Sequence, residues 1–215
     1  MLRYSIKYRA LSKLKGKLSD WPTKLIIAKL IILKKHKMSI YQIIAKIGPK
    51  LISKNKLFKY GFNFSPMYKR STAKIIQVSE DLLNVRIKLP ISYKNKNYAN
   101  SIFGGSMFSA VDPIPMVQLI NLIGTSYVVW DKSVEVFFKK PAKENLYADF
   151  NYSEKELTEI KEQVSKKNEI EIIKITKLTN KDGTQVYSVV KKTIYIADKE
   201  FFKQKLKEAS KDQSI

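Results

Sequence analysis

One segment of the sequence is apolar along almost its whole length, and it limits the folds that the chain can adopt. Gly104-Gly105 precedes this segment and Gly124 ends it, and residues 106–123 predict a helix that is hydrophobic nearly all round. A helix of this kind has to be buried. The cover must come from the segments on either side of it.

Those flanking segments alternate between apolar and polar residues, which is the pattern of strands. Residues 73–79 and 83–89 predict a hairpin around Glu80-Asp81. Further strands are predicted at 126–138, 146–152, 170–178 and 185–196. Residues 154–167 are highly charged and predict a surface helix or a mobile connection. Because one antiparallel sheet can wrap a single buried helix, the pattern predicts an α+β fold.

Charge separates the front of the chain from this body. Residues 1–70 contain 18 basic residues and one acidic residue, whereas residues 71–215 have a net charge of only +5. Capping residues and Gly-Pro stops in the front predict three short amphipathic helices, over 21–36, 39–48 and 50–60. We therefore expect a basic helical extension over residues 1–61, a main domain over 62–197 and a polar tail over 198–215.

The sequence allows two kinds of contact surface for the basic extension. Its lysines suit an anionic membrane surface, where each contributes about 1 kcal/mol. Alternatively, its apolar faces pack on the main domain or on a second subunit while the lysines face water. Nucleic acid is not expected, because only four of the 41 basic residues are arginine. The longest apolar run, residues 25–33, is too short to cross a bilayer, so we expect a cytoplasmic protein that lies at most on the inner membrane surface.

The composition also excludes several kinds of site. The chain has no cysteine and one histidine, His36. A disulfide, a cysteine nucleophile and a multi-histidine metal centre are therefore excluded within one chain. We expect no metal and no cofactor.

Residues 97–113 are the richest in groups that can support chemistry. Gly104-Gly105 before a helix leaves backbone N–H groups free at the positive end of the helix dipole, which suits a developing oxyanion. Asp112 lies about two turns into that helix and is a candidate general base or nucleophile. A second interpretation stays open, in which the helix begins at Asp112-Pro113 and the carboxylate only caps it. Pro115 favours this capping interpretation, because proline deep inside a helix costs about 3 kcal/mol.

The same residues resemble the hot-dog fold thioesterases. In that superfamily an Asn is followed six residues later by a His and then by Gly-Gly, with an acidic residue eight positions after the first Gly. Phe103 stands here in place of the His. Over residues 62–197 the chain is most similar to an uncharacterised bacterial family of that superfamily, through five motifs in order: Asn97-Tyr98, Phe103-Gly104-Gly105-Ser106, Asp112-Pro113, Val129-Trp130-Asp131-Lys132 and Phe138-Lys139-Lys140-Pro141.

This resemblance implies a hot-dog domain that forms a homodimer or a dimer of dimers and hydrolyses an acyl thioester, with acyl-CoA as the expected substrate. Asp112 would activate water or attack the carbonyl, the Gly104 or Gly105 N–H would polarise that carbonyl, and Asn97 would orient water or substrate. The expected substrate contacts are Phe103, Ser106, Lys132 and Lys139, with the lysines near the phosphates of the carrier.

Two simpler interpretations remain beside these roles. Because Phe103 replaces the His, the protein can instead be a non-catalytic acyl-CoA or lipid-binding protein. For Trp130-Asp131-Lys132, a tryptophan anchor at a strand start together with a surface ion pair is the simpler interpretation.

Overall fold

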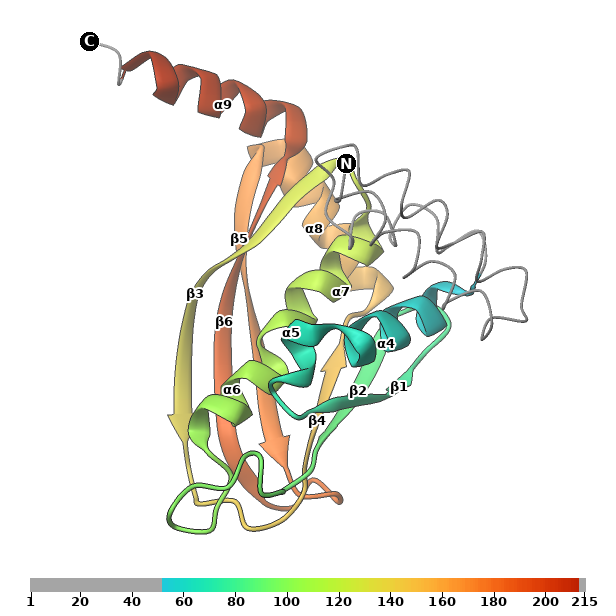
Figure 1. The fold of residues 1–215 in the computed structure, drawn as a ribbon. Coiled ribbons are helices and arrows are strands. Elements are labelled where there is room, and N and C mark those ends of the chain that lie inside the picture. Colours follow the sequence, from blue (N-terminus) through green and yellow to red (C-terminus); the bar gives the residue numbers. More distant parts are fainter. Residues whose placement is uncertain (1–51, 213–215) are drawn as a thin grey trace, which may run out of the picture. The chain divides into compact units, whose positions relative to one another are not determined.

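A six-stranded antiparallel sheet wraps around one helix in the computed structural model, which describes residues 52–212 (Figure 1). The strand order is β1-β2-β4-β5-β6-β3, so β1 and β3 are the two edges. The strands are β1 Lys74–Val78, β2 Asn84–Leu89, β3 Tyr127–Phe138, β4 Leu146–Asn151, β5 Glu169–Thr179 and β6 Val186–Asp198. The predicted α+β hot-dog arrangement is confirmed.

The wrapped helix consists of α6, Gly104–Val111, and α7, Pro113–Ile123. Asp112 between them has φ −52° and ψ −53°, so the backbone stays helical through the junction. Pro113 and Pro115 have no N–H to donate to the preceding turn, which explains why the hydrogen-bonding pattern is interrupted there. The helix predicted over 106–123 is therefore present and begins at Gly104.

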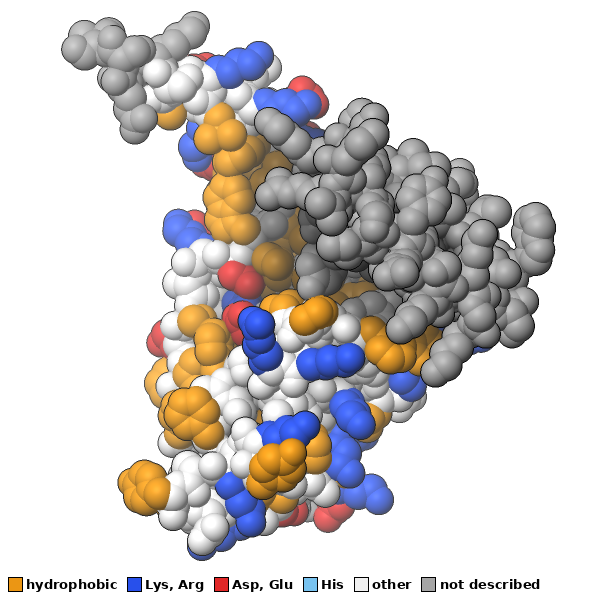
Figure 2. Space-filling view, in the orientation of Figure 1, with side chains coloured by type: hydrophobic (Ala, Val, Ile, Leu, Met, Phe, Trp, Pro, Cys, Tyr) orange, Lys and Arg blue, Asp and Glu red, His pale blue; other side chains and the backbone are white. Residues whose placement is uncertain are grey.

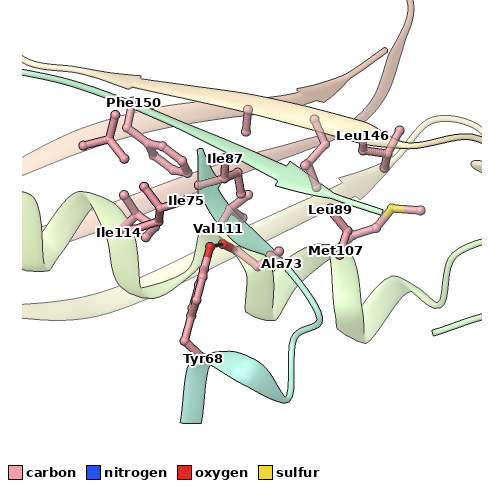
Figure 3. Close-up of a cluster of buried hydrophobic side chains, with 14 of the residues drawn as sticks. Tyr68, Ala73, Ile75, Ile87, Leu89, Met107, Val111, Ile114, Leu146 and Phe150 are labelled. Carbon is pink, nitrogen blue, oxygen red and sulfur yellow. Dashed lines mark hydrogen bonds between the residues drawn. The ribbon is translucent and has the colours of Figure 1, made fainter. Parts of the chain in front are cut away.

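The main core lies between this helix and the concave face of the sheet (Figure 3). Tyr68 of the short helix α5, Pro66–Lys69, enters it fully buried, and its hydroxyl donates to the Ala110 carbonyl at 3.0 Å. Burial raises the pKa of Tyr68, so its hydroxyl stays protonated. The other labelled core side chains are Ala73, Ile75, Ile87, Leu89, Met107, Val111, Ile114, Leu146 and Phe150.

Helix α4, Lys54–Phe64, covers the β1 edge of the sheet. Its Asn63 amide pairs with the backbone of Ile75, donating to the carbonyl at 2.9 Å and accepting from the N–H at 2.8 Å. Phe58 and Phe62 are buried in the main core, which explains why the helix runs past the predicted end at residue 60. A compact unit extends from Ser53 onward, and residue 62, where the main domain is predicted to start, lies within α4.

Two further helices complete the unit. Helix α8, Glu154–Lys167, lies between β4 and β5 in sequence and begins at Ser153, whose side chain accepts from the Glu156 N–H at 3.1 Å. Its apolar face closes a second core with Leu119 and Ile123 of α7, so the predicted surface helix is confirmed. Helix α9, Lys199–Asp212, forms the polar tail.

Within residues 52–212, one helical stretch, Gly104–Ile123, is long and apolar enough to cross a membrane by length and composition alone. It is the helix that the sheet wraps, and Ile114 and Leu119 on it are fully buried, so core packing accounts for its composition. The helices predicted over 21–36 and 39–48, and the surface that the basic extension contacts, lie outside the described residues.

Candidate functional site

Asp112 forms an ion pair with Lys192 in the middle of the wrapped helix. The Lys192 Nζ lies 2.5 Å from Asp112 Oδ1 and also donates to the Asp112 backbone carbonyl. Lys192 points inward from β6 and is only 2% exposed, whereas the Asp112 side chain is 39% exposed. The carboxylate makes no capping bond to α7. The capping interpretation is confirmed for the start of α7, which begins at Pro113 with Asp112 at the N-cap position. It is wrong about the carboxylate, which satisfies no backbone donor of α7 and binds an ammonium instead.

Asp131 of β3 is the third member of this group. Its Oδ2 lies 2.8 Å from the same Lys192 Nζ. Asp131 is opposite Ile194 in the register of β3 and β6, which turns its side chain toward the buried helix. We call Asp112, Asp131 and Lys192 the Lys192 cluster. Two carboxylates share one ammonium in it, so its formal charge is −1.

Asp131 is poorly solvated within the cluster. Its Oδ1 is buried and has no hydrogen-bond partner among the described residues. Burial raises the pKa of the Asp131 carboxyl above its ordinary value, while the Lys192 ammonium acts in the opposite direction. A buried carboxylate of this kind next to a candidate base is typical of functional sites.

Lys192 is not among the residues that the sequence motifs indicate. The sequence does contain an indication that Lys192 is buried. Side chains alternate between the two faces of β6, so Lys192 lies on the same face as Val190 and Ile194, which both face the core. A lysine in phase with buried positions needs a partner of opposite charge. The pattern does not say which carboxylates supply it.

Trp130 and Lys132 of the same motif face the other way, whereas Val129 packs against the second core. The Trp130 ring stacks on Tyr195 with centroids 4.4 Å apart, and Lys132 forms an ion pair with Glu171 on the outer face of β3 and β5. The expected anchor and surface ion pair are thus present. The structure does not bring Lys132 together with Asp112, because Lys132 falls where the register of β3 shifts between Asp131 and Ser133, at a β-bulge.

The double glycine forms the first turn of α6. Phe103 is the N-cap, and no side chain caps this helix. The N–H groups of Gly104 and Gly105 have no acceptor among the described residues, as expected for the first turn of an uncapped helix. A Cβ on Gly104 would lie 2.8 Å from the Phe138 ring, and one on Gly105 would lie 2.3 Å from the Phe103 ring. Glycine at both positions thus lets an aromatic ring pack close to the backbone, and a larger residue would require that exposed ring to move.

Asn97 and Ser106 flank this turn on either side. The Asn97 Oδ1 accepts from the N–H of Ala99 at 3.0 Å and from the N–H and hydroxyl of Ser101 at 3.1 Å. Asn97 thus orders the loop that leads into α6. Ser106 is half-buried in the first turn, where its N–H donates to the Phe103 carbonyl at 3.0 Å.

Exposed apolar side chains gather along β3 and the start of α6, at the left of the view in Figure 2. Phe103 is 57% and Phe138 56% exposed, and Val134 and Phe137 lie on the same strand as Phe138. Lys139 follows them, exposed, with its Nζ 5.7 Å from the centroid of the Phe137 ring. No element among residues 52–212 covers the β3 edge, which carries these apolar side chains, in contrast to the β1 edge under α4.

A separate cleft of about 310 Å³ opens between β4 and β5. It is lined by Pro115, Tyr152 and Lys174, among others, and by none of the predicted site residues. Of the predicted residues, Phe103, Gly104 and Gly105 lie at the start of α6 next to Phe138 of β3, whereas Lys132 lies on the outer face of the sheet. Among residues 52–212 there is no group of three side chains that could hold a metal ion.

Comparison with known families identifies this arrangement. Residues 54–196 match the family model described as "Domain of unknown function (DUF4442)". The chain belongs to the DUF4442 family. No curated protein matches the DUF4442 chain significantly.

Two solved structures with the same fold align with this DUF4442 chain over most of their own length. A Pseudomonas aeruginosa protein of unknown function, described as a probable thioesterase, has a TM-score of 0.59 and 16% identity, covering 66% of this chain and 95% of its own. A Chlorobaculum tepidum protein of unknown function has a TM-score of 0.55 and 17% identity, covering 67% and 94%. At these identities the likeness shows the fold alone, which is the hot-dog fold.

Proposed function

We propose that this DUF4442 protein hydrolyses acyl thioesters, with acyl-CoA as the substrate class. The observation that carries the proposal is the ion-paired Asp112 in the middle of the wrapped helix of a hot-dog fold. The uncapped first turn of α6 and the apolar side chains on β3 support it. The thioesterase description of the P. aeruginosa neighbour agrees with it.

In this proposal Asp112 acts as the general base. Its carboxylate takes a proton from water, the resulting hydroxide adds to the thioester carbon, and the C–S bond then breaks. The thiolate receives the proton that Asp112 holds, so the carboxylate is regenerated. The N–H groups of Gly104 or Gly105 stabilise the carbonyl oxygen as it becomes negative.

One chain cannot supply both groups to one carbonyl. Gly104 and Asp112 are eight residues apart on a helix that rises about 1.5 Å per residue, so they lie about 12 Å apart along its axis. An oxyanion donor has to lie about 3 Å from the carbonyl oxygen. We therefore infer a dimer in which the glycine turn of one copy faces Asp112 of the other.

The β3 edge is the expected contact between the two copies. It is a long edge strand with apolar side chains, whereas Asn63 covers the opposite edge. An uncovered edge strand is a template for pairing with another chain. The acyl chain would then lie along Phe103 and Phe138, while Lys139 and Lys132 would meet the phosphates of the carrier.

This assembly predicts that Val134→Lys converts a dimer into a monomer. A lysine in the middle of β3 would bury its charge against the second copy, and lysines on edge strands oppose pairing. The measurement is the molar mass of the full chain by light scattering during gel filtration. Ile173→Lys is the matched control, because Ile173 is 56% exposed but lies on the central strand β5. A monomeric wild-type protein at all concentrations would contradict the dimer.

The hydrolysis itself is tested with the purified full chain and a panel of acyl-CoA thioesters of increasing acyl length, by following the release of free thiol. We expect release well above the spontaneous rate for at least one chain length. No release from any member of the panel would contradict the proposed function.

One observation favours non-catalytic acyl-CoA or lipid binding as the second candidate. The Phe103 ring, at the position where the superfamily pattern has His, packs against Gly105, one of the two candidate carbonyl-polarising residues. A ring in this place limits access to the Gly105 N–H. Saturable acyl-CoA binding by calorimetry without thiol release would support this candidate over the hydrolase.

A further inference from the structure

Lys192 and Asp131 lie next to the Asp112 carboxylate, which is the general base in the proposed function. The proposed mechanism gives no role to either residue. We infer that Lys192 is the positioning residue of Asp112, and that the opposite charges of Lys192 and Asp131 set how readily Asp112 takes up a proton. The inference rests on the proposed function for its catalytic meaning. The charge arrangement behind it can be tested without any activity.

The positioning follows from three bonds to one nitrogen. The Lys192 Nζ binds Asp112 Oδ1 at 2.5 Å, Asp131 Oδ2 at 2.8 Å and the Asp112 backbone carbonyl. The Lys192 side chain is buried, so it cannot follow a moving partner. Lys192 therefore holds Asp112 through the carboxylate Oδ1 and through the Asp112 backbone carbonyl. The Asp112 Oδ2 has no hydrogen-bond partner among the described residues and is left for water.

The neighbouring charges do not neutralise the cluster. Lys174 is opposite Lys192 in the register of β5 and β6, but its Nζ already pairs with Glu156 of α8 at 2.8 Å. The Tyr152 ring centroid lies 3.9 Å from the Lys174 Nζ, and burial raises the pKa of the Tyr152 hydroxyl, so it stays neutral.

The other packed elements add no compensating charge. The wrapped helix contains no ionisable residue except Asp112, and Tyr68 of α5 is neutral. Lys132, Glu135 and Lys191 of β3 and β6 are paired on the outer face. Within the part of the chain that the structure describes, the excess carboxylate of the Lys192 cluster therefore has no compensating charge.

Two substitutions then move the proton affinity of Asp112 in opposite directions. Asp131→Asn removes the second negative charge and leaves Lys192 to Asp112 alone, so the pKa of Asp112 falls. Lys192→Met removes the cation and leaves two facing carboxylates, so the pKa of Asp112 rises.

The measurement is a pH titration of the full chain labelled with 13C in its aspartate side chains, followed by carboxyl NMR. The Asp112 signal is assigned by its loss in Asp112→Asn. Lys191→Met and Glu135→Gln are the matched controls, because this ion pair of 2.8 Å joins the same two strands on the outer face. We expect both controls to leave the Asp112 titration unchanged.

Shifts of the Asp112 titration in opposite directions in the two variants would support the inference. An Asp112 titration that is unchanged in both variants would overturn it. If Lys192→Met does not fold, the nearly isosteric Asp131→Asn decides alone, because it keeps the cation in place. For an active protein the acidic limb of the kcat/KM profile should move with the Asp112 titration, while KM stays within about twofold. Absence of hydrolysis would remove the proposed function and leave the titration as the independent test.

Discussion

Replacing Asp112 by Asn is expected to lower kcat for thioester hydrolysis by about 10²–10⁴-fold, which is the usual contribution of a general base. The amide keeps the size of the side chain, and its oxygen can still accept from Lys192, but it cannot take a proton from water. The fold should persist, because Asp112 is partly exposed and makes no capping bond. The measurement is steady-state thiol release, together with a circular dichroism spectrum of the variant.

Asp149→Asn is the matched control for this substitution. Asp149 lies on β4, is 52% exposed and pairs with Arg86 at 3.6 Å. A surface pair of this kind contributes at most about 1 kcal/mol. Its substitution should leave kcat unchanged. If Asp112→Asn is as active as Asp149→Asn, Asp112 is not the base and the assigned mechanism fails.

The second large effect is expected on stability. Lys192→Met should lower the free energy of unfolding at pH 7 by about 3 kcal/mol, within the range for breaking a buried ion pair. The loss arises because Asp112 and Asp131 keep their charges and lose their shared partner. Equilibrium denaturation by urea measures it, with Lys191→Met as an exposed control expected within about 0.5 kcal/mol of wild type.

The double variant Lys192→Met with Asp131→Asn isolates the reason for this loss. Removing the second carboxylate should restore part of the stability, because one of the two unpaired charges is gone. The difference between Lys192→Met and wild type should also shrink toward pH 4. Protonation then neutralises the Asp131 carboxyl, whose pKa is raised by burial. Equal losses in the single and double variants would show that Lys192 stabilises the fold by packing alone.

Local sequence patterns predicted most of the elements. Alternation indicated six strands, and the apolar run between glycines indicated the wrapped helix, because period two and all-round hydrophobicity are local properties of the chain. The ends of elements were less predictable. Helix α4 runs past Gly61 to Phe64 because Phe58 and Phe62 bury themselves in the core, and that tertiary packing outweighs a single glycine.

The candidate site was predictable only in part. Motif spacing indicated Asp112 and the double glycine, which lie on one helix, and their separation along it follows from helix geometry. It also offered capping as a role for Asp112, and local patterns could not decide between the two interpretations. That decision needed the observation that the Asp112 carboxylate makes no capping bond to α7 and binds Lys192.

The sequence by itself determined that one buried helix needs a sheet around it, that no cysteine chemistry is possible, and that Asp112 is the acidic residue within that helix. Only the tertiary structure decided what surrounds that carboxylate. Lys192 lies 80 positions from Asp112 and 61 from Asp131 in the chain. Pairing of β3 with β6 brings Asp131 to the Lys192 nitrogen, and packing of the wrapped helix against the sheet brings Asp112 to it. Local residue patterns predict neither the pairing of distant strands nor the packing of a helix on them.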